Sequence, residues 1–375
     1  MKPFRGMSLF ALSLLLISGC ADKPTQNEPV ASQAKNTEKS TETPKAAVPE
    51  SEVKLAESLK TLGAKLKQDQ AGYVIEVDFR GTKIDDAALK EIAGLSHLRS
   101  LLLNETPITD AALESVGKVT TLENLDLRNR SLNNKAISYL TGLSKLKALR
   151  LSGNSDIDDD AMADINQLTN LKALMLDFLW VSGDGLSQLK DLNKLEELYL
   201  AKTLVDDDGL ATLTQFPKLK KTRLSQNQIS DEGLAVFAKI PQLEELDLSE
   251  NSLLSDAGMK HLSGLGKLKK LNLWRVGLTD AGVEPLQGLT SLEWLNLDNT
   301  RLTNAGLKYL KDMQKLEFLH LGSTAVSDEG LKDLEPLTSL KDLKLTRTAV
   351  TEKGVAELKK KLPNTEIQLK YIEGQ

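Results

Sequence analysis

The chain has 375 residues, of which 40% are hydrophobic, 4% aromatic and 27% charged, and its formal net charge at pH 7 is −5. This mildly acidic balance argues against a nucleic-acid-binding protein. Because Cys20 is the single cysteine, an intramolecular disulfide and a cysteine-based metal site are excluded.

Residues 1–19 have the pattern of an export signal peptide. Lys2 and Arg5 precede a mostly apolar run from Leu9 to Ile17, which is too short for the roughly 20 residues of a membrane-spanning helix. The run ends in the letters ISGC, and this ending resembles the lipobox of bacterial lipoproteins. The resemblance implies that Cys20 is acylated, for example with palmitate, and becomes the mature N-terminus. The alternative is a plain secretion signal with an incidental cysteine.

The segment 20–50 is expected to be a lipidated cysteine followed by a disordered linker. It contains four prolines and almost no large apolar side chain, so it cannot bury enough surface to fold. In the lipoprotein family an aspartate after the cysteine favours retention in the inner membrane. The residue here is Ala21, which implies the outer membrane.

Residues 51–73 are predicted to form an N-terminal capping helix. Leu55, Leu59, Leu62 and Leu66 fall on one stripe at helical spacing. Repetitive folds need such caps because a terminal repeat would otherwise expose its core face.

From Val74 the chain repeats with a period of 24 residues, occasionally 25, and this period defines twelve units. Each unit begins with an alternation such as Leu316, Leu319 and Leu321, which predicts a short strand. A Ser or Thr followed by acidic residues then predicts a capped helix start. The units start at Val74, Leu98, Leu122, Leu146, Leu171, Leu195, Leu219, Leu243, Leu268, Leu292, Leu316 and Leu340.

Two further positions of the unit carry packing information. The residue after the strand is mostly Thr, and sometimes Asn, and either side chain can satisfy the backbone of the turn. The fourteenth residue of the regular units is Ala or Gly, which indicates that the helix start crowds the neighbouring unit.

These features resemble the leucine-rich-repeat family, most closely the ribonuclease-inhibitor and F-box-associated types. The resemblance implies an α/β right-handed solenoid over residues 74–361, closed by a C-terminal cap over 362–375. The parallel strands would line the concave face of a horseshoe, because the wider helices must spread on the convex face.

The third, fifth and seventh residues of each unit should point into the concavity. From the sixth to the ninth unit, the charge of the third residue alternates in sign from one unit to the next. This pattern predicts a ladder of weak surface ion pairs. At the fifth position of neighbouring units, Asp126 should lie beside Arg150, and Arg223 should lie beside Asp247. The third residues from the sixth unit onward are Glu197, Lys221, Glu245, Lys270, Trp294, Phe318 and Asp342.

An aromatic group interrupts this ladder. We define the concave cluster as Trp274, Trp294, Phe318 and His320. Exposed aromatic side chains with polar neighbours are typical of a recognition patch, and the alternative is that the rings only pack on one another. The polar rim is predicted to contain Asn272, Asn296, Asp298 and Asp342.

A second candidate patch lies near the fifth unit. Its turn, DFLWVSG, is unusually apolar because Leu179 replaces the usual threonine. Binding and an irregularly packed turn are equally compatible with this pattern. The candidate residues are Met175, Phe178, Trp180 and Tyr199.

The spacing of the polar residues does not predict a catalytic site or a metal site. His320 could pair with Asp298 or Asp342, but nothing in the sequence fixes a nucleophile, a base and an orienting group in contact. The acidic run from Asp156 to Asp160 lacks the glycine and terminal glutamate of a calcium-binding EF-hand loop. We therefore expect no catalytic residues, no metal site and no cofactor.

The sequence favours a lipid-anchored, monomeric scaffold that binds another protein at the bacterial cell envelope. A module that binds cell-wall glycan is the alternative, since aromatic platforms with Asn and Asp also suit carbohydrate. An enzyme and an F-box-type ubiquitin-ligase adaptor are more distant alternatives, the latter because an export signal contradicts that compartment.

Overall fold

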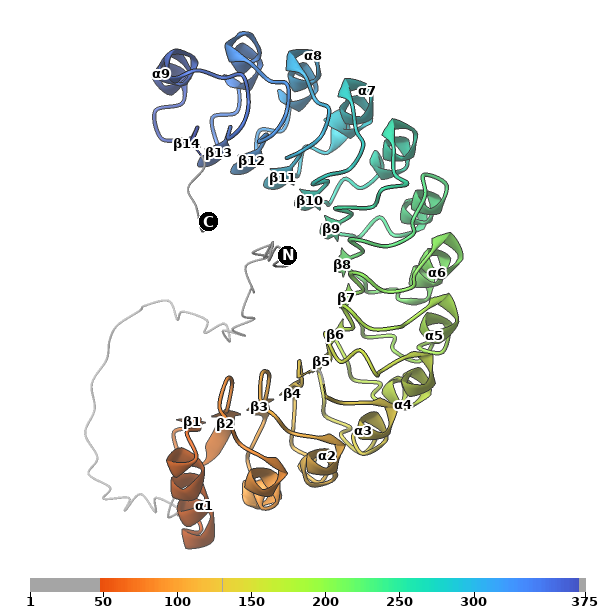
Figure 1. Ribbon diagram of the computed structural model, residues 1–375, viewed down its shortest axis with the longest axis vertical. Helices are drawn as coiled ribbons and strands as arrows, with labels where there is room; N and C mark the ends of the chain where they lie inside the picture. Colours follow the sequence, from red (N-terminus) through yellow and green to blue (C-terminus); the bar gives the residue numbers. More distant parts are fainter. Residues whose placement is uncertain (1–47, 130, 371–375) are drawn as a thin grey trace, which may run out of the picture. The chain divides into compact units, whose positions relative to one another are not determined.

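The computed structural model describes residues 48–129 and 131–370. Cys20 and the expected export signal therefore lie outside the described residues, as does most of the expected linker. The described residues belong to one compact unit. Its strands line the inner side of an open arc and its helices lie on the outer side (Figure 1). This arrangement confirms the predicted α/β solenoid with a concave sheet.

Fourteen strands form a single sheet in which the spatial order follows the order of the chain. Strand β1 is antiparallel to β2, and every later neighbouring pair is parallel. The strands are β1 Lys65–Gln68, β2 Val74–Asp78, β3 Ser100–Leu102, β4 Asn124–Asp126, β5 Ala148–Arg150, β6 Ala173–Met175, β7 Glu197–Tyr199, β8 Lys221–Arg223, β9 Glu245–Asp247, β10 Lys270–Asn272, β11 Trp294–Asn296, β12 Phe318–His320, β13 Asp342–Lys344 and β14 Glu366–Gln368.

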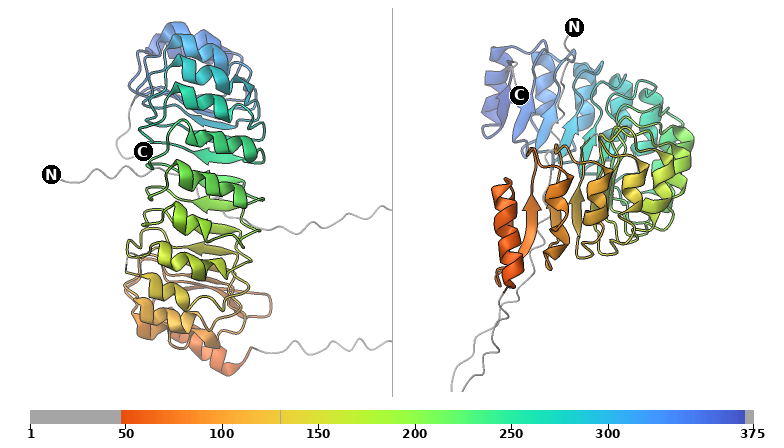
Figure 2. Two further views of the ribbon diagram at one scale, coloured as in Figure 1. Left: turned by 90° about the vertical axis from the view of Figure 1, so that its right-hand side faces the viewer. Right: turned by 60° about the horizontal axis from the view of Figure 1, so that its bottom comes forward.

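The convex helices are short, and many of them are 3₁₀ helices (Figure 2). The α-helices are α1 Glu50–Thr61, α2 Asp110–Val116, α3 Asn134–Ser138, α4 Met162–Asn166, α5 Gly183–Ser187, α6 Asp207–Ala211, α7 Asp280–Val283, α8 Asn304–Leu307 and α9 Glu352–Lys361. The 3₁₀ helices are η1 Asp86–Leu89, η2 Ile92–Gly94, η3 Asp159–Ala161, η4 Thr212–Gln215, η5 Gly233–Lys239, η6 Asp256–Leu262, η7 Glu284–Gly288, η8 Lys308–Leu310 and η9 Asp328–Leu334. Over the described range, none of the helices combines the length and the apolar composition that a membrane crossing requires.

The leucines of the repeat build one continuous core. In the tenth unit Leu292, Leu295 and Leu297 are fully buried, while Trp294 and Asn296 between them are only half-buried. This alternation follows from the two-residue period of a strand. The period therefore decides which side chains reach the concave face.

The predicted role of the residue after the strand is confirmed in most turns. The hydroxyl of Thr300 donates to the carbonyl oxygen of Leu297 at 2.8 Å, and Thr324 does the same to Leu321 at 2.6 Å. Where the residue is Asn251, the side-chain amide donates to two carbonyl groups, those of Leu224 and Leu248. Each asparagine therefore ties two units together, whereas the hydroxyls of Thr300 and Thr324 bond within their own turns.

Successive helix starts are joined by a contact that we call the forward bracket. The carboxylate of Asp280 accepts from the backbone N–H and the hydroxyl of Thr303 in the next unit, at 2.8 and 2.6 Å. Asp328 holds Thr351 in the same way, at 2.7 and 2.6 Å. Thr303 and Thr351 are themselves the capping residues of α8 and α9. Most units therefore position the helix cap of the unit after them, and the exception is the unit in which Gly183 stands at this place.

The forward bracket explains the small fourteenth residue. A Cβ added to Gly354 would lie 2.0 Å from a carboxylate oxygen of Asp328, and one added to Gly306 would lie 2.5 Å from that of Asp280. The expected crowding by the neighbouring unit is thus confirmed. In the described structure the crowding group is mainly the bracketing side chain.

The N-terminal cap differs from the prediction. The helix α1 ends at Thr61, and Leu66 lies in the antiparallel strand β1 instead of on a helical stripe. The reason is Gly63, whose φ of +95° turns the chain back towards β2. Leu62 consequently stays 45% exposed, and the cap is a helix followed by a strand.

Candidate recognition surface

The alternating charges on the concave face form the predicted ladder. Lys221 pairs with Glu197 at 3.2 Å and with Glu245 at 3.4 Å, and Lys270 continues the row by pairing with Glu245 at 3.5 Å. Neighbouring strands bring these residues into register. The ladder satisfies its own charges along β7 to β10.

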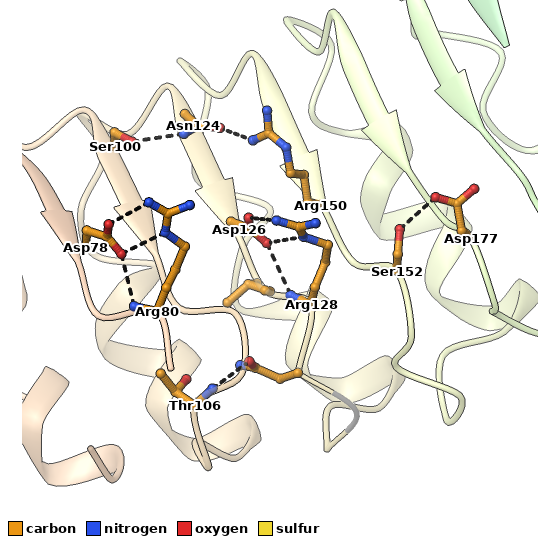
Figure 3. Close-up of polar contacts among 12 residues, drawn as sticks. Asp78, Arg80, Ser100, Thr106, Asn124, Asp126, Arg128, Arg150, Ser152 and Asp177 are labelled. Carbon is orange, nitrogen blue, oxygen red and sulfur yellow. Dashed lines mark hydrogen bonds and ion pairs between the residues drawn. The ribbon is translucent and has the colours of Figure 1, made fainter. Parts of the chain in front are cut away.

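The two pairs expected from fifth residues are adjacent in the register, and each includes a residue with another ionic partner. Asp126 and Arg150 are neighbours in register, but Asp126 pairs with Arg128 at 2.5 Å (Figure 3). Arg223 is the register neighbour of Asp247 and pairs with Asp177 at 3.2 Å. The register decides which residues are adjacent, but a long arginine side chain can pair with a carboxylate other than that of its register neighbour.

Figure 3 shows a polar network that the sequence did not predict, on the concave side of the early units. Arg150 donates to the side-chain oxygen of Asn124, and the side-chain NH2 group of Asn124 donates to the hydroxyl of Ser100. Burial lowers the pKa of Arg150, and the nearby charge of Asp126 opposes this shift. The guanidinium therefore lies partly desolvated, with the neutral side chain of Asn124 as a hydrogen-bond partner.

Asp177 holds the next part of this surface together. Its carboxylate accepts from the backbone N–H of Ala201 at 2.9 Å, from the hydroxyl of Ser152 at 3.1 Å and from Arg223. Burial raises the pKa of Asp177, and the positive charge of Arg223 opposes the rise. This side chain fixes the loops that follow β5, β6 and β7.

Three residues of the concave cluster, Trp294, Phe318 and His320, are joined by direct ring contacts. Trp294 and Phe318 are register neighbours, and their rings stack with centroids 4.9 Å apart and planes 4° from parallel. The ring of His320 meets Phe318 edge-on, with centroids 6.3 Å apart. Trp274 lies in the turn after β10, whose neighbour β11 begins with Trp294, and its indole opposes the rise in the pKa of Asp298. All four aromatic side chains are half-buried.

Asp298 and His320 form the polar centre of this group, with 3.9 Å between the Asp298 Oδ1 and His320 Nε2 atoms. Burial raises the pKa of Asp298, while the charge of His320 and hydrogen bonds from Ser323 and Trp274 oppose the rise. Burial also lowers the pKa of His320, against the attraction of Asp298. The imidazole is therefore neutral at neutral pH, and it can both donate and accept.

A glycine that the sequence analysis overlooked permits this arrangement. A Cβ on Gly322 would lie 2.7 Å from Asp298 Oδ1, 2.8 Å from His320 Nε2 and 2.9 Å from the hydroxyl of Thr346. Gly322 occupies the seventh place of its unit, where other units carry a side chain that faces the concavity. The absence of a side chain there lets three polar groups converge.

The predicted rim residues have different environments. Asn296 and Asp298 are half-buried, and the side-chain oxygen of Asn296 accepts from the backbone N–H of Asp298 at 2.9 Å. Asp342 is also half-buried and pairs with Lys344 at 3.0 Å. Asn272 is buried and accepts from the backbone N–H of Trp274 at 3.2 Å. Asn272 therefore lies beneath the surface and holds the backbone of Trp274.

The second candidate patch divides into two parts. Met175 and Tyr199 are register neighbours on the sheet, where Met175 is buried and Tyr199 is half-buried beneath Arg223, whose guanidinium lies 4.9 Å from the ring centroid. Phe178 and Trp180 lie in the following turn and are 51% and 59% exposed.

Sequence reasoning missed a neighbour of this turn, the 43% exposed Leu204. The repeat could have identified this residue, because Leu204 follows Trp180 by one 24-residue period.

The described residues also bear on metal binding. No group of three or more His, Cys, Asp or Glu side chains between residues 48 and 370, with residue 130 left aside, is arranged to hold a metal ion. The acidic run near residue 158 instead serves helix starts, because the side chain of Asp158 accepts from the backbone N–H of Asp160 at 3.0 Å.

Comparison with protein families matches a leucine rich repeat model to residues 266–326, and a second leucine rich repeat model to residues 217–238 and 241–263. Among solved structures, an internalin from Listeria monocytogenes is similar with a TM-score of 0.57 and 21% identity, over 87% of this chain and 96% of that chain. This similarity shows the fold.

Two further solved structures are similar at lower TM-scores. Internalin C2 of Listeria monocytogenes has a TM-score of 0.46 and 24% identity, over 56% of this chain and 83% of that chain. The plant peptide hormone receptor RGFR1, in complex with RGF2, has a TM-score of 0.45 and 15% identity, over 81% and 59%. Comparison with curated protein sequences finds no match.

Proposed function

Because the chain folds as a leucine-rich-repeat solenoid, we propose that it is a non-catalytic scaffold that binds another protein with its concave face. Solenoids of this kind present an extended concave surface whose side chains vary while the core stays constant. The observation that carries the proposal is the concave cluster, which interrupts an otherwise self-paired ladder of charges.

The geometry of the cluster favours a protein over a glycan. Trp294 and Phe318 stack on each other along the ladder, so one face of each ring is already covered. The adjoining places in register belong to Lys270 and Asp342. The rings therefore offer mainly their edges to the concavity, whereas sugar rings pack best on an open aromatic face. Half-buried aromatic side chains with polar neighbours are suited to anchoring a partner's side chains.

We expect a Trp274→Ala/Trp294→Ala double variant to lose its protein partner. The measurement is cross-linking in the bacterial envelope followed by capture of the full-length chain. Recovery of the partner should fall at least about tenfold, as expected when anchoring aromatic residues are truncated. A Phe178→Asn/Trp180→Ser variant is the matched control, because it removes two exposed aromatic side chains away from the concave cluster and should capture the partner as the wild type does.

Two outcomes would count against the concave assignment. Equal capture by the Trp274→Ala/Trp294→Ala variant, with its circular dichroism unchanged, would remove the cluster from the interface. A tryptophan fluorescence shift with cell-wall glycan fragments at millimolar concentration, lost in that variant, would favour the carbohydrate alternative instead.

We further propose that Cys20 anchors the scaffold to the bacterial outer membrane through acyl chains. More than one chain is needed for stable attachment, because a single acyl chain binds a bilayer only marginally. Labelled palmitate supplied to expressing cells should enter the wild type and should not enter Cys20→Ala, which should also leave the membrane fraction. Equal label in both proteins would refute acylation at Cys20.

A further inference from the structure

A second apolar surface lies away from the concave cluster. We define the flank patch as Phe178, Trp180 and Leu204, which occupy the turns after β6 and β7. These are three of the six large hydrophobic side chains that are exposed in the described structure. Exposed apolar side chains that gather on neighbouring turns mark contact sites more often than isolated ones do.

The flank patch rests on a fixed backbone. The N–H of Phe178 donates to Ala201 at 2.8 Å, and the N–H of Leu204 donates to Val181 at 2.9 Å, so each unit's turn is bonded to the next. The N–H of Trp180 donates to the carbonyl oxygen of Ile157 in the preceding unit, at 3.3 Å. The three side chains are therefore presented by a preorganised surface, which lowers the entropic cost of binding.

Phe178 is unfavourable for folding in two ways. It has a φ of +64°, in the left-handed region that bulky side chains rarely adopt, and half of its side chain is exposed. Phe178 is the eighth residue of its unit. The eighth residues of ten other units also have a positive φ, and each of them is polar or a glycine. Those residues are Gly81, Glu105, Gly153, Lys202, Gln226, Glu250, Arg275, Asn299, Ser323 and Arg347.

The flank patch has a strongly acidic surround. The turns and helix starts 154–161, 178–185 and 202–209 contain eight aspartates and one lysine. The corresponding segments 275–282, 299–306 and 323–330 contain three acidic residues and two arginines. Within the described residues, the aspartates around the patch form no ion pair with Lys or Arg. Several cap helix starts, as Asp206 does for Gly209.

We propose that the flank patch binds a polypeptide segment that carries apolar side chains next to Lys or Arg. The apolar centre would bury the hydrophobic residues, and the surrounding carboxylates would attract the basic ones. The Nζ atom of Lys202 already lies 5.8 Å from the ring centroid of Phe178, so this ring faces a cation in the unbound protein. This inference does not depend on the concave cluster.

The test uses the full-length chain and a fluorescent peptide that alternates leucine with arginine. Two control peptides replace either every arginine with glutamate or every leucine with serine. The Leu/Arg peptide should bind, with an affinity that falls as salt rises, and both control peptides should bind at least about tenfold more weakly. Equal binding of the Leu/Glu peptide would overturn the charge argument, and equal binding of the Ser/Arg peptide would overturn the apolar one.

Variants locate the site. Phe178→Asn/Trp180→Ser should weaken Leu/Arg peptide binding by at least about tenfold, and Asp156→Asn/Asp208→Asn should weaken it while reducing its salt dependence. Trp274→Ala/Trp294→Ala should bind this peptide like the wild type, so failure here is distinguishable from failure of the concave proposal. Loss of binding only in the Trp274→Ala/Trp294→Ala variant would overturn the assignment to the flank.

The single variant Phe178→Asn separates a binding role from a structural one. Asparagine adopts the left-handed region more readily than phenylalanine, so the variant should unfold at an equal or higher urea concentration than the wild type while binding the peptide more weakly. A lower unfolding midpoint would show that Phe178 stabilises the turn and would contradict the proposal.

Discussion

A Gly117→Ala substitution should lower the free energy of unfolding by about 3 kcal/mol, although it adds only one methyl group. Gly117 ends the helix α2, and a Cβ there would lie 2.0 Å from the carbonyl oxygen of Tyr139 and 3.0 Å from its carbonyl carbon. Both atoms belong to the backbone of the next unit, so no side-chain rotation relieves the clash. The measurement is the urea midpoint of the full-length chain.

Gly142→Ala is the matched control in the neighbouring unit. No atom lies within 4 Å of a Cβ at Gly142, so alanine there should leave stability unchanged or raise it by about 0.4–1 kcal/mol, because it restricts the unfolded chain. Similar midpoints for the two variants would mean that the units are not packed backbone against backbone at Gly117.

The second large effect is expected at Asn251, which is fully buried. Its side chain accepts from the backbone N–H of Asn227 at 2.8 Å and donates to the carbonyl oxygens of Leu224 and Leu248 at 2.9 and 2.8 Å. Asn251→Ala would leave all three backbone groups without this partner. Because each lost bond costs about 1 kcal/mol, the expected loss of stability is about 3 kcal/mol.

Asn251→Thr is the informative comparison for this position. Thr300 fills the equivalent place in another unit and bonds only to the carbonyl oxygen of Leu297. A threonine at position 251 should therefore restore the bond to Leu248 alone, and its urea midpoint should lie between those of the wild type and Asn251→Ala. Equal midpoints for the alanine and threonine variants would contradict the role of the hydroxyl.

The architecture was predicted from the resemblance of the repeat to the leucine-rich-repeat family. The alternation of Leu295 and Leu297 suits a strand that buries alternate residues, and twelve copies must stack to cover one another. The same period placed Trp294 beside Phe318, and the structure stacks these two rings.

Departures from the period were predicted less well. The helix α1 was expected to include Leu66, because a stripe of leucines cannot reveal that Gly63 reverses the chain. The partners of Arg128 and Arg223 were missed since long side chains reach beyond the nearest register neighbour. Spacing alone also could not show that Phe178 has a left-handed backbone conformation, which depends on the geometry of its turn.

The forward bracket gives assembly of the solenoid a direction. Asp280 reaches Thr303 and Asp328 reaches Thr351, so the acid belongs to the earlier unit of each pair. During synthesis the N-terminal units leave the ribosome first. Most completed units therefore already carry the carboxylate, or in Asn134 and Asn304 the amide oxygen, that will hold the next helix cap, and they act as templates for the units that follow. Growth by addition to a finished end, as in a one-dimensional crystal, is the folding order that this contact favours.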